Sequence, residues 1–293
     1  VLIKMSKILL LGGTGFIGKS LLSQLENTNS VKLMIHNSNI NTNAQKFNGN
    51  ILSKNSFMNK IDNGETIINL LGQMTSDESN FYLSNILGTL NLLNSCIGKK
   101  IKQIIFISSI NVYGENLVRS SKETDQLCPK TTYGHVKMLT ENLYKEFSET
   151  HGINTTVLRF ANIYGPTKKT GFLIKLIKSI KNKKIIPECY NDGNQQRDFL
   201  FIDDVIDCIE NTINYKNDGF EIFNISSGMR YSMNTVISKI EKIADTKLNV
   251  KYNSEIPDEK CIWADNSKAK KLLGFEPKFD IDSGLKSLIN NIL

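Results

Sequence analysis

The chain has 293 residues, of which 40% are hydrophobic and 22% charged, and its formal net charge of +7 comes mostly from lysines spread along the sequence. This is the composition of a soluble globular protein long enough for one large α/β domain, or one domain with a smaller appendage. No basic cluster is interleaved with aromatics and no apolar run approaches membrane-spanning length, so we expect neither a nucleic-acid partner nor a membrane partner.

The first expected element is a buried strand that leads through a glycine-rich turn into a helix. Gly12, Gly15 and Gly18 fall three residues apart directly after the apolar run that starts at Lys7. In a dinucleotide-binding fold, one such glycine allows the tight turn, one lets the backbone approach the pyrophosphate, and one lets the helix pack on the strand.

The same stretch also fits another class of site, the phosphate loop of nucleoside triphosphatases, which has the pattern G-x-x-x-x-G-K-[ST] from Gly13 to Ser20. That class needs a neighbouring strand that ends in Asp to hold magnesium. The next buried strand, residues 66–72, ends in Asn69-Leu70-Leu71-Gly72. Phe16 and Ile17 also suit a helix facing a sheet better than a solvated loop. A dinucleotide is therefore the favoured ligand.

The second strand, Val31–Ile35, is followed by His36 and Asn37. In the usual dinucleotide pattern an acidic residue closes this strand and binds the adenine ribose hydroxyls. An imidazole would not repel a 2′-phosphate, so the cofactor can be NAD or NADP. A plain surface histidine at a strand end fits the sequence equally well.

Residues 39–64 are polar and irregular, with a short strand expected near Ile51-Leu52. After the strand over residues 66–72, a helix is predicted over residues 79–96. One face of that helix carries Leu83, Ile86, Leu87, Leu90 and Leu93.

The next buried strand, residues 103–107, brings Ser108-Ser109 to the carboxyl edge of the sheet, where ligands bind in such folds. A long helix over residues 133–150 and a strand over residues 155–160 follow. This alternation predicts an α/β fold with a doubly wound parallel sheet, the NAD(P)-binding Rossmann fold.

The alternation loosens after Pro166. We expect a Rossmann domain over residues 1–166 and a smaller, mainly substrate-binding region over residues 167–293, in which a strand at 220–225 rejoins the main sheet. Further helices are predicted over 171–184, 203–215 (capped by Asp203 or Asp204), 232–244, 267–273 and 282–292.

Five cysteines are widely spaced and include no Cys-x-x-Cys pair. This argues against a disulfide framework and against a metal site. Because no signal-peptide core is visible at the start of the sequence either, we expect a cytoplasmic protein.

Tyr133 and Lys137 lie one helical turn apart on the same face of a predicted helix. A tyrosine titrates near pH ~10, and a cation held beside it brings its pKa toward the working pH, which makes it a usable acid/base. Ser109, at the end of a neighbouring strand, can bond the same substrate oxygen. The pair alone is a weak signal, but it becomes specific after a glycine-rich turn and a Ser-Ser strand end.

Taken together, these motifs resemble the extended short-chain dehydrogenases/reductases, and among them the NAD-dependent nucleotide-sugar epimerase/dehydratase family. The resemblance covers nearly the whole chain. It rests on Gly12–Gly18, Asn85–Thr89, Ser108–Gly114, Tyr133–Lys137, Leu158–Pro166, Gln196–Phe199 with Asp203-Asp204, and Trp263–Asp265 leading to Leu272–Phe275.

The resemblance implies a role for each matching residue. Tyr133 is the catalytic acid/base, Lys137 tunes it and binds the nicotinamide ribose, and Ser109 helps to bind the substrate oxygen. Further cofactor contacts are implied at Gly12, Gly15, Phe16, Ile17, Gly18, His36, Asn37, Leu70, Leu71, Gly72, Asn85 and Phe160. Substrate contacts are implied at Ser109, Asn111, Asn162 and Arg197.

Asn162 and Arg197 match the positions that hold the sugar-nucleotide diphosphate, and the planar fork of Arg suits phosphate oxygens. For Arg197 the alternative is a surface ion pair with Asp198 or Asp203. Glu255 stands where many members of the family have a second diphosphate-binding Arg, so the substrate must be held differently there.

Ile110-Asn111 stands where dehydratases of the family carry Asp-Glu, which argues against dehydration. The favoured reaction is C4 epimerisation of a nucleotide sugar through a transient 4-keto sugar. The alternative is NAD(P)H-dependent 4-ketoreduction of a nucleotide-linked keto-deoxysugar, which His36 favours. A dinucleotide-sensing protein without catalysis is more distant, because Ser109, Tyr133 and Lys137 are intact.

The helices over residues 79–96 and 133–150 resemble the pair that family members pack into an intermolecular four-helix bundle. We therefore expect a homodimer. The alternative is that their apolar stripes only cover the sheet. The family also implies a role in polysaccharide biosynthesis.

Overall fold

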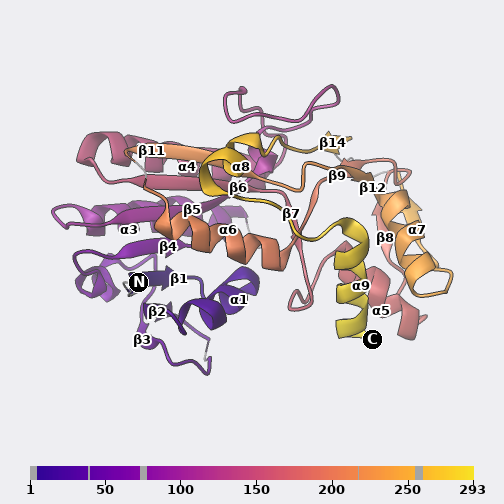
Figure 1. Cartoon of the computed structure of the whole chain (residues 1–293), viewed down its shortest axis with the longest axis horizontal. Helices are drawn as coiled ribbons and strands as arrows, with labels where there is room; N and C mark the ends of the chain where they lie inside the picture. The colour runs from indigo at the N-terminus through magenta and orange to yellow at the C-terminus, as the bar shows by residue number, and fades with distance from the viewer. Residues whose placement is uncertain (1–4, 39, 73–77, 217, 255–259) are drawn as a thin grey trace.

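The structure, a computed structural model, describes residues 5–38, 40–72, 78–216, 218–254 and 260–293, and is organised around a seven-stranded parallel sheet (Figure 1). From one edge to the other the strands are β11 (Phe220–Ile225), β6 (Thr155–Phe160), β5 (Gln103–Ser109), β4 (Thr66–Asn69), β1 (Lys7–Leu11), β2 (Ser30–Ile35) and β3 (Gln45–Asn48). This order confirms the predicted doubly wound α/β fold.

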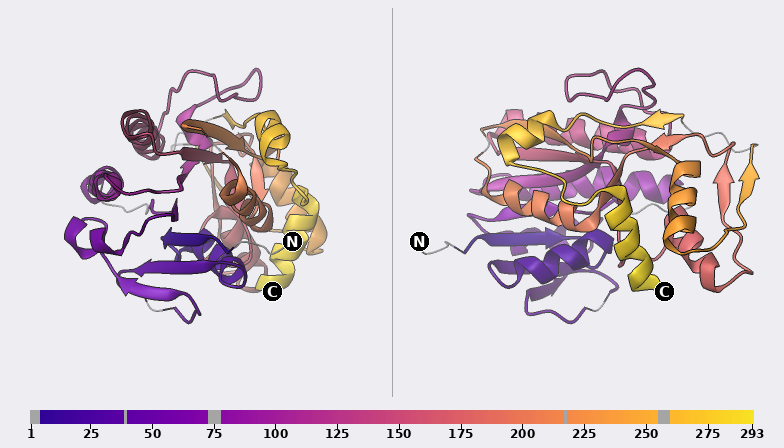
Figure 2. Two further views of the ribbon diagram at one scale, coloured as in Figure 1. Left: turned by 60° about the vertical axis from the view of Figure 1, so that its left-hand side comes forward. Right: turned by 45° about the vertical axis from the view of Figure 1, so that its right-hand side comes forward.

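Helices cover both faces of the sheet, as the views in Figure 2 show. One face packs on α1 (Phe16–Leu25) and α6 (Ile202–Asn214), and the other on α3 (Gly88–Cys96) and α4 (Thr132–His151). Because both faces are covered, every residue of β4, β5 and β6 is buried. In the described part of the chain, no helix is both long and apolar enough to cross a bilayer.

The chain beyond β6 contributes one strand to the main sheet and forms smaller units beside it. Strand β11 pairs with β6 in parallel register, with Phe223 opposite Leu158. The smaller strands are β7 (Asn162–Tyr164), β8 (Glu188–Tyr190), β9 (Gln196–Arg197), β10 (Phe199–Phe201), β12 (Tyr231–Ser232), β13 (Lys251–Asn253) and β14 (Cys261–Ile262). The remaining helices of this half are α5 (Phe172–Lys181), α7 (Met233–Ile243), α8 (Ser267–Leu273) and α9 (Ile281–Ile292).

The short strand predicted near Ile51-Leu52 is wrong, because these residues lie in a turn and the strand is β3. The Asn50 side chain accepts a hydrogen bond from the Leu52 backbone N–H at 3.0 Å, and the Asn50 N–H donates to Ser56 Oγ at 2.8 Å. Side-chain bonds of this kind favour a turn over a ladder of strand hydrogen bonds.

The helix predicted over residues 79–96 contains a change of helical type. It consists of α2 (Glu78–Tyr82), a π-helical segment (Leu83–Leu87) and α3. The wider π turn shifts the helical register, so the predicted apolar face divides. Leu93 is buried, whereas Leu83, Leu87 and Leu90 remain 48%, 40% and 38% exposed.

Neither Asp203 nor Asp204 caps α6, as the sequence had suggested. The helix starts one residue earlier, with Phe201 at the N-cap position. Asp204 is buried in the first turn, where its carboxylate accepts the backbone N–H groups of Lys278 at 2.8 Å and Phe279 at 3.3 Å. This carboxylate therefore ties the segment before α9 to α6.

Candidate active site

The glycine turn between β1 and α1 is as tight as its sequence predicts. Gly12 has φ +81°, in the left-handed region that favours glycine, and its carbonyl accepts the Gly15 N–H at 3.1 Å. A Cβ on Gly18 would lie 2.2 Å from the Gly12 oxygen, so only glycine lets α1 pack this closely. A Cβ on Gly15 would meet only that oxygen, at 3.3 Å, because this side of the turn is open.

The turn fits the pyrophosphate of a dinucleotide. Helix α1 starts at Phe16, has Gly15 at its N-cap without a capping side chain, and carries no acidic residue in its first turn. The first N–H groups of a helix, here those of Phe16, Ile17 and Gly18, have no partner within the helix, and its positive dipole end favours an anion. Leu70 and Leu71, just past β4, border the turn within 3.2 Å of a Cβ placed on Gly12.

The three predicted catalytic residues come together at the carboxyl end of β5. Helix α4 places Tyr133 in front of Ser109, the last residue of β5, and their side chains hydrogen-bond. Lys137 Nζ lies 5.9 Å from the centre of the Tyr133 ring and donates to the Ile107 carbonyl at 2.8 Å.

Burial shifts both titrating groups of this cluster. It raises the pKa of the Tyr133 phenol, against a smaller lowering effect of the hydrogen bond with Ser109. It also lowers the pKa of Lys137 to about 8, although the charge of Glu141 acts in the opposite direction. The sequence suggested a lowered pKa for Tyr133, so the direction found here is the opposite, because loss of hydration of the phenolate outweighs the hydrogen bond.

The other predicted cofactor residues lie on several elements, and Gly72 adjoins this cluster. Gly72 is so close to Lys137 that a Cβ there would be 2.8 Å from Nζ. Asn85 lies in the π turn, buried, and donates to the Phe81 carbonyl at 2.8 Å. Phe160 is the register partner of Ser109 but is buried in the core. His36 and Asn37 are both exposed, directly after β2.

Asn111 and Ser109 are joined at the start of the 3₁₀ turn Ile110–Val112. The Asn111 N–H donates to Ser109 Oγ, and Ser109 Oγ donates to Asn111 Oδ1, both at 3.3 Å. Asn111 thus helps to orient the Ser109 hydroxyl. The substrate contact that the resemblance implies for Asn111 stays a prediction.

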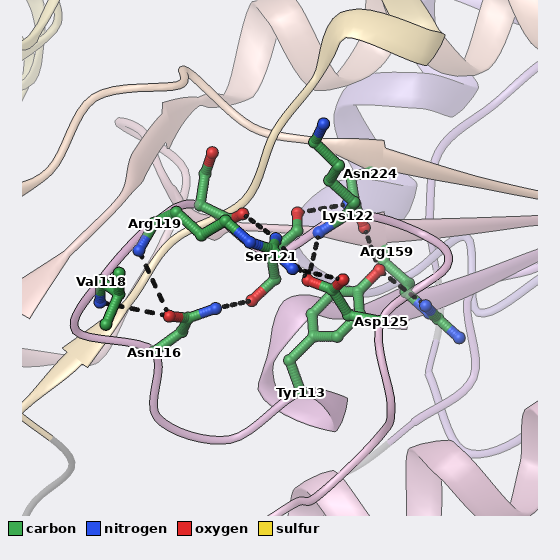
Figure 3. A network of polar contacts seen from close by, with 10 residues as sticks. Tyr113, Asn116, Val118, Arg119, Ser121, Lys122, Asp125, Arg159 and Asn224 are labelled. Carbon is green, nitrogen blue, oxygen red and sulfur yellow. Dashed lines mark hydrogen bonds and ion pairs between the residues drawn. The ribbon is translucent and has the colours of Figure 1, made fainter.

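A buried polar network behind the catalytic helix was missed by the sequence analysis. Arg159 of β6 pairs with Glu141 of α4 at 2.6 Å, and its Nη1 donates to the Tyr113 hydroxyl at 2.6 Å. Tyr113 in turn donates to Asn224 Oδ1 at 2.7 Å, and Asn224 Nδ2 donates to the Ser121 carbonyl at 3.0 Å (Figure 3). The network fixes α4 on the sheet. The only signal for it in the sequence is a carboxylate one turn after Lys137.

Asn162 and Arg197 line one pocket of about 200 Å³. They meet because β7 pairs with β10, with the Asn162 N–H donating to the Asp198 carbonyl at 3.0 Å. Ser109, Tyr133 and Lys137 do not line this pocket.

The Asp198 carboxylate, one candidate ion-pair partner for Arg197, accepts hydrogen bonds from Ser227 and from the Gly228 N–H. Burial raises its pKa to about 7. Glu255 lies outside the described residues.

Comparison with known proteins places these features in a family. The model of the "NAD dependent epimerase/dehydratase family" matches residues 8–226. The chain belongs to this family.

Among its relatives is the UDP-glucuronate 4-epimerase of Thermodesulfobacterium geofontis, 34% identical over 71% of this chain and 64% of that protein. Two solved structures are similar over nearly their full lengths. The UDP-glucose 4-epimerase of Thermotoga maritima with UDP-glucose has a TM-score of 0.89 and 27% identity, and covers 97% of this chain and 98% of its own. The UDP-glucuronic acid 4-epimerase of Bacillus cereus with UDP-glucuronic acid and NAD has a TM-score of 0.87 and 27% identity, and covers 98% of each chain.

Membership of this family confirms the resemblance seen in the sequence, and it confirms a nicotinamide dinucleotide as the cofactor, with NAD the form that the family uses. The phosphate-loop alternative for Gly13–Ser20 is excluded by the same match. The protein is therefore an enzyme of this family, with its glycine turn at the start of α1 and its tyrosine and lysine on α4.

Proposed function

We propose that the protein is a UDP-sugar 4-epimerase, which inverts C4 of a UDP-linked hexose through a transient 4-keto sugar. The observation that carries the proposal is the hydrogen-bonded pair of Ser109 and Tyr133 with the buried Lys137 beside it. Relatives and similar structures that act on UDP-glucose and UDP-glucuronic acid support the substrate class.

In the proposed reaction, C4 of the sugar is oxidised to a ketone, the 4-keto sugar turns in the site, and a hydride returns to its other face. Bound NAD would supply the hydride acceptor and donor. Tyr133 accepts the proton of the C4 hydroxyl when the hydride leaves and gives it back when the hydride returns, so no proton or electron is consumed overall. Ser109 bonds the same oxygen and is oriented by Asn111. Lys137 places a cation beside Tyr133, and this charge favours the phenolate form that accepts the proton.

The remaining site residues divide between the two ligands in this proposal. Residues 1–166 hold the cofactor, with contacts from Gly12, Gly15, Phe16, Ile17, Gly18, His36, Asn37, Leu70, Leu71, Gly72, Asn85 and Phe160. Residues 167–293 mainly hold the substrate, where Arg197 joins Asn162 in the pocket that receives its diphosphate.

The test is to purify the protein, dialyse it, and incubate it with UDP-glucose or UDP-glucuronic acid without added cofactor. We expect the dialysed protein to retain NAD and to convert one of these substrates to its C4 epimer. Nuclear magnetic resonance monitors the conversion. Turnover of a 4-keto substrate that consumes added NADPH in equal amounts, without epimerisation, would establish the ketoreductase instead.

We also propose that the protein acts as a homodimer in the cytoplasm, in polysaccharide biosynthesis. Exposed leucines support the dimer, since Leu83, Leu87 and Leu90 on the π turn and α3, and Leu139 on α4, are each 38% to 48% exposed. Such a surface gains from burial against a second copy. Light scattering should give twice 33.0 kDa, and Leu87→Glu should shift the mass toward the monomer.

A further inference from the structure

The pocket that contains Asn162 and Arg197 is lined by a second cationic side chain. Besides Arg197 it is lined by Lys168, and none of the described residues that line it is acidic. Its other walls are mostly apolar and include Tyr164, Phe172 and Phe199. Two cationic side chains on one pocket attract an anionic ligand.

Lys168 is held in this pocket by the turn after β7. The Lys168 N–H donates to the Gly165 carbonyl at 3.2 Å, which turns the chain back on itself. Lys168 Nζ then donates to the Ile163 carbonyl at 2.8 Å, and no described carboxylate forms an ion pair with it. An ammonium has three donors, so this bond leaves hydrogen-bonding capacity for a ligand. Burial lowers the pKa of this lysine, a direction that an anion would reverse.

Two further sources of hydrogen-bond donors line the same pocket, one a side chain and the other the start of a helix. Asn162 Nδ2 is buried, and none of the described residues accepts a hydrogen bond from it. Gly171 and Phe172, which line the pocket, are the N-cap and first residue of α5, a helix without a capping side chain and without an acidic residue in its first turn. An unpaired buried donor is costly unless a ligand satisfies it.

We propose that Lys168 binds the diphosphate of the nucleotide sugar together with Arg197 and Asn162, an inference that rests on the proposed function. Lys168 supplies a second cation for the diphosphate, because this chain has Glu255 where many members of the family have an arginine. A diphosphate has acceptors on two phosphorus centres, so two cations on one pocket match it better than one. Lys168 is a binding residue in this proposal and takes no part in the proton transfer at Tyr133.

The substrate diphosphate is favoured over that of the cofactor because of where Lys168 lies. It shares its pocket with Arg197, whereas Gly12, Gly15 and Gly18 do not line that pocket. The Phe16 ring, 5.6 Å from Lys168 Nζ, lies at the start of α1 and packs near Gly165. The lysine therefore reaches the edge of the cofactor turn with its charge on the side of the substrate pocket.

The experiment measures UDP binding to the full-length protein by calorimetry, for wild type, Lys168→Met and the control Lys169→Met. Lys169 is the exposed neighbour in the same turn and lines no described pocket. We expect Lys168→Met to weaken UDP binding by about tenfold or more, and Lys169→Met to change it less than twofold. Binding of uridine, which has no phosphate, should be the same in all three proteins.

NAD binding separates the two possible diphosphates, and turnover separates this inference from the proposed function. If Lys168→Met weakens NAD binding instead of UDP binding, or leaves both within twofold of wild type, the inference is wrong. If it weakens UDP binding in a protein that does not epimerise UDP-sugars, the inference stands and the proposed reaction fails. In an active enzyme we expect a raised KM for the UDP-sugar and a kcat within threefold of wild type.

Discussion

The central sheet and the smaller sheets formed by the chain after β6 are built in different ways. Strands of the central sheet have up to seven residues, and in three strands, β4, β5 and β6, every residue is buried. After β6, strands β9, β12 and β14 have two residues each and form one small sheet from distant parts of the chain. The first region depends on local patterns in the sequence, and the second depends on contacts between segments that the sequence keeps apart.

The same contrast applies to the site. Ser109, Tyr133 and Lys137 stand on β5 and α4, which are long and packed in the core. Arg197 stands on a two-residue strand and Lys168 in a turn. The proposed catalytic residues therefore stand on core elements, and the proposed substrate contacts on segments that can differ between relatives without changing the sheet.

The largest effect should come from the rigid region. Tyr133→Phe keeps the ring beside Phe81, whose centre is 6.3 Å away, but removes the transferable proton. We expect kcat to fall by about 10² or more, with UDP and NAD binding unchanged in calorimetry. A variant that turns over within threefold of wild type would show that the proton is handled elsewhere.

The sequence predicted the first region well because its signals are local. The apolar run before Gly12, the spacing of the glycines and the Tyr133–Lys137 pair each identify an element without reference to the rest of the chain. The pocket was predicted only through Asn162 and Arg197. Lys168 was missed because a lysine in a polar loop has no pattern of its own, and its role depends on the turn at Gly165 and on the pairing of β7 with β10.

The features of the first region that the sequence did not predict also depend on contacts without a local sequence pattern. The strand near Ile51-Leu52 was misplaced because a side-chain bond from Asn50 decides the local backbone. The apolar face of the helix predicted over residues 79–96 was divided by a π turn, which no residue pattern marked. The partnership of Glu141 with Arg159 joins a helix to a strand that follows it, so it becomes visible only in the fold.

A second test compares one glycine from each region. Gly18→Ala places a Cβ 2.2 Å from the backbone oxygen of Gly12, whereas Gly284→Ala in α9 places one 1.9 Å from the hydroxyl at the far end of Tyr164. Backbone cannot move aside as a side chain can, so we expect Gly18→Ala to lower the unfolding free energy by about 3 kcal/mol and Gly284→Ala by about 1 kcal/mol. Urea unfolding measures both.

The binding of NAD and of UDP should also differ between the two glycine variants. Gly18→Ala should lose NAD binding and, where it remains folded, keep binding of UDP. Gly284→Ala should do the reverse, since Tyr164 lines the pocket with Arg197. If both variants lost affinity for NAD and for UDP to the same extent, the two regions would not bind their ligands independently.

A third prediction concerns the charge buried in the rigid region. The pKa of Lys137 is about 8 in the folded protein against an ordinary value of 10.5. Between these pH values the unfolded chain binds a proton that the folded protein has released, so stability rises with pH across that window. Below pH 8 both states are protonated and the full penalty of burying the ammonium is present.

We therefore expect the unfolding free energy of wild type, relative to Lys137→Met, to increase by about 2–3 kcal/mol as pH rises from 8 to 10.5. Urea unfolding at pH 7, 8, 9 and 10 checks this. The variant should be inactive at every pH, which separates the catalytic need for the cation from its effect on stability. A constant difference across the pH range would show that Lys137 is not the titrating group.

The smallest effect is expected at the rim of the cofactor site, where the rigid region meets solvent. His36 is exposed directly after β2, at the place where a carboxylate usually binds the adenine ribose hydroxyls. A carboxylate there accepts both hydroxyl bonds and repels a 2′-phosphate, but an exposed group gains little from either contact because water competes for it. His36→Asp should therefore shift the preference between NADH and NADPH toward NADH by about 1 kcal/mol, or roughly fivefold in the ratio of dissociation constants.

Asn37→Asp, one residue further on, serves as the control for the added charge. Equal shifts in both variants would mean that the charge acts through the general field of the surface, and an unchanged ratio in both would mean that His36 points away from the ribose.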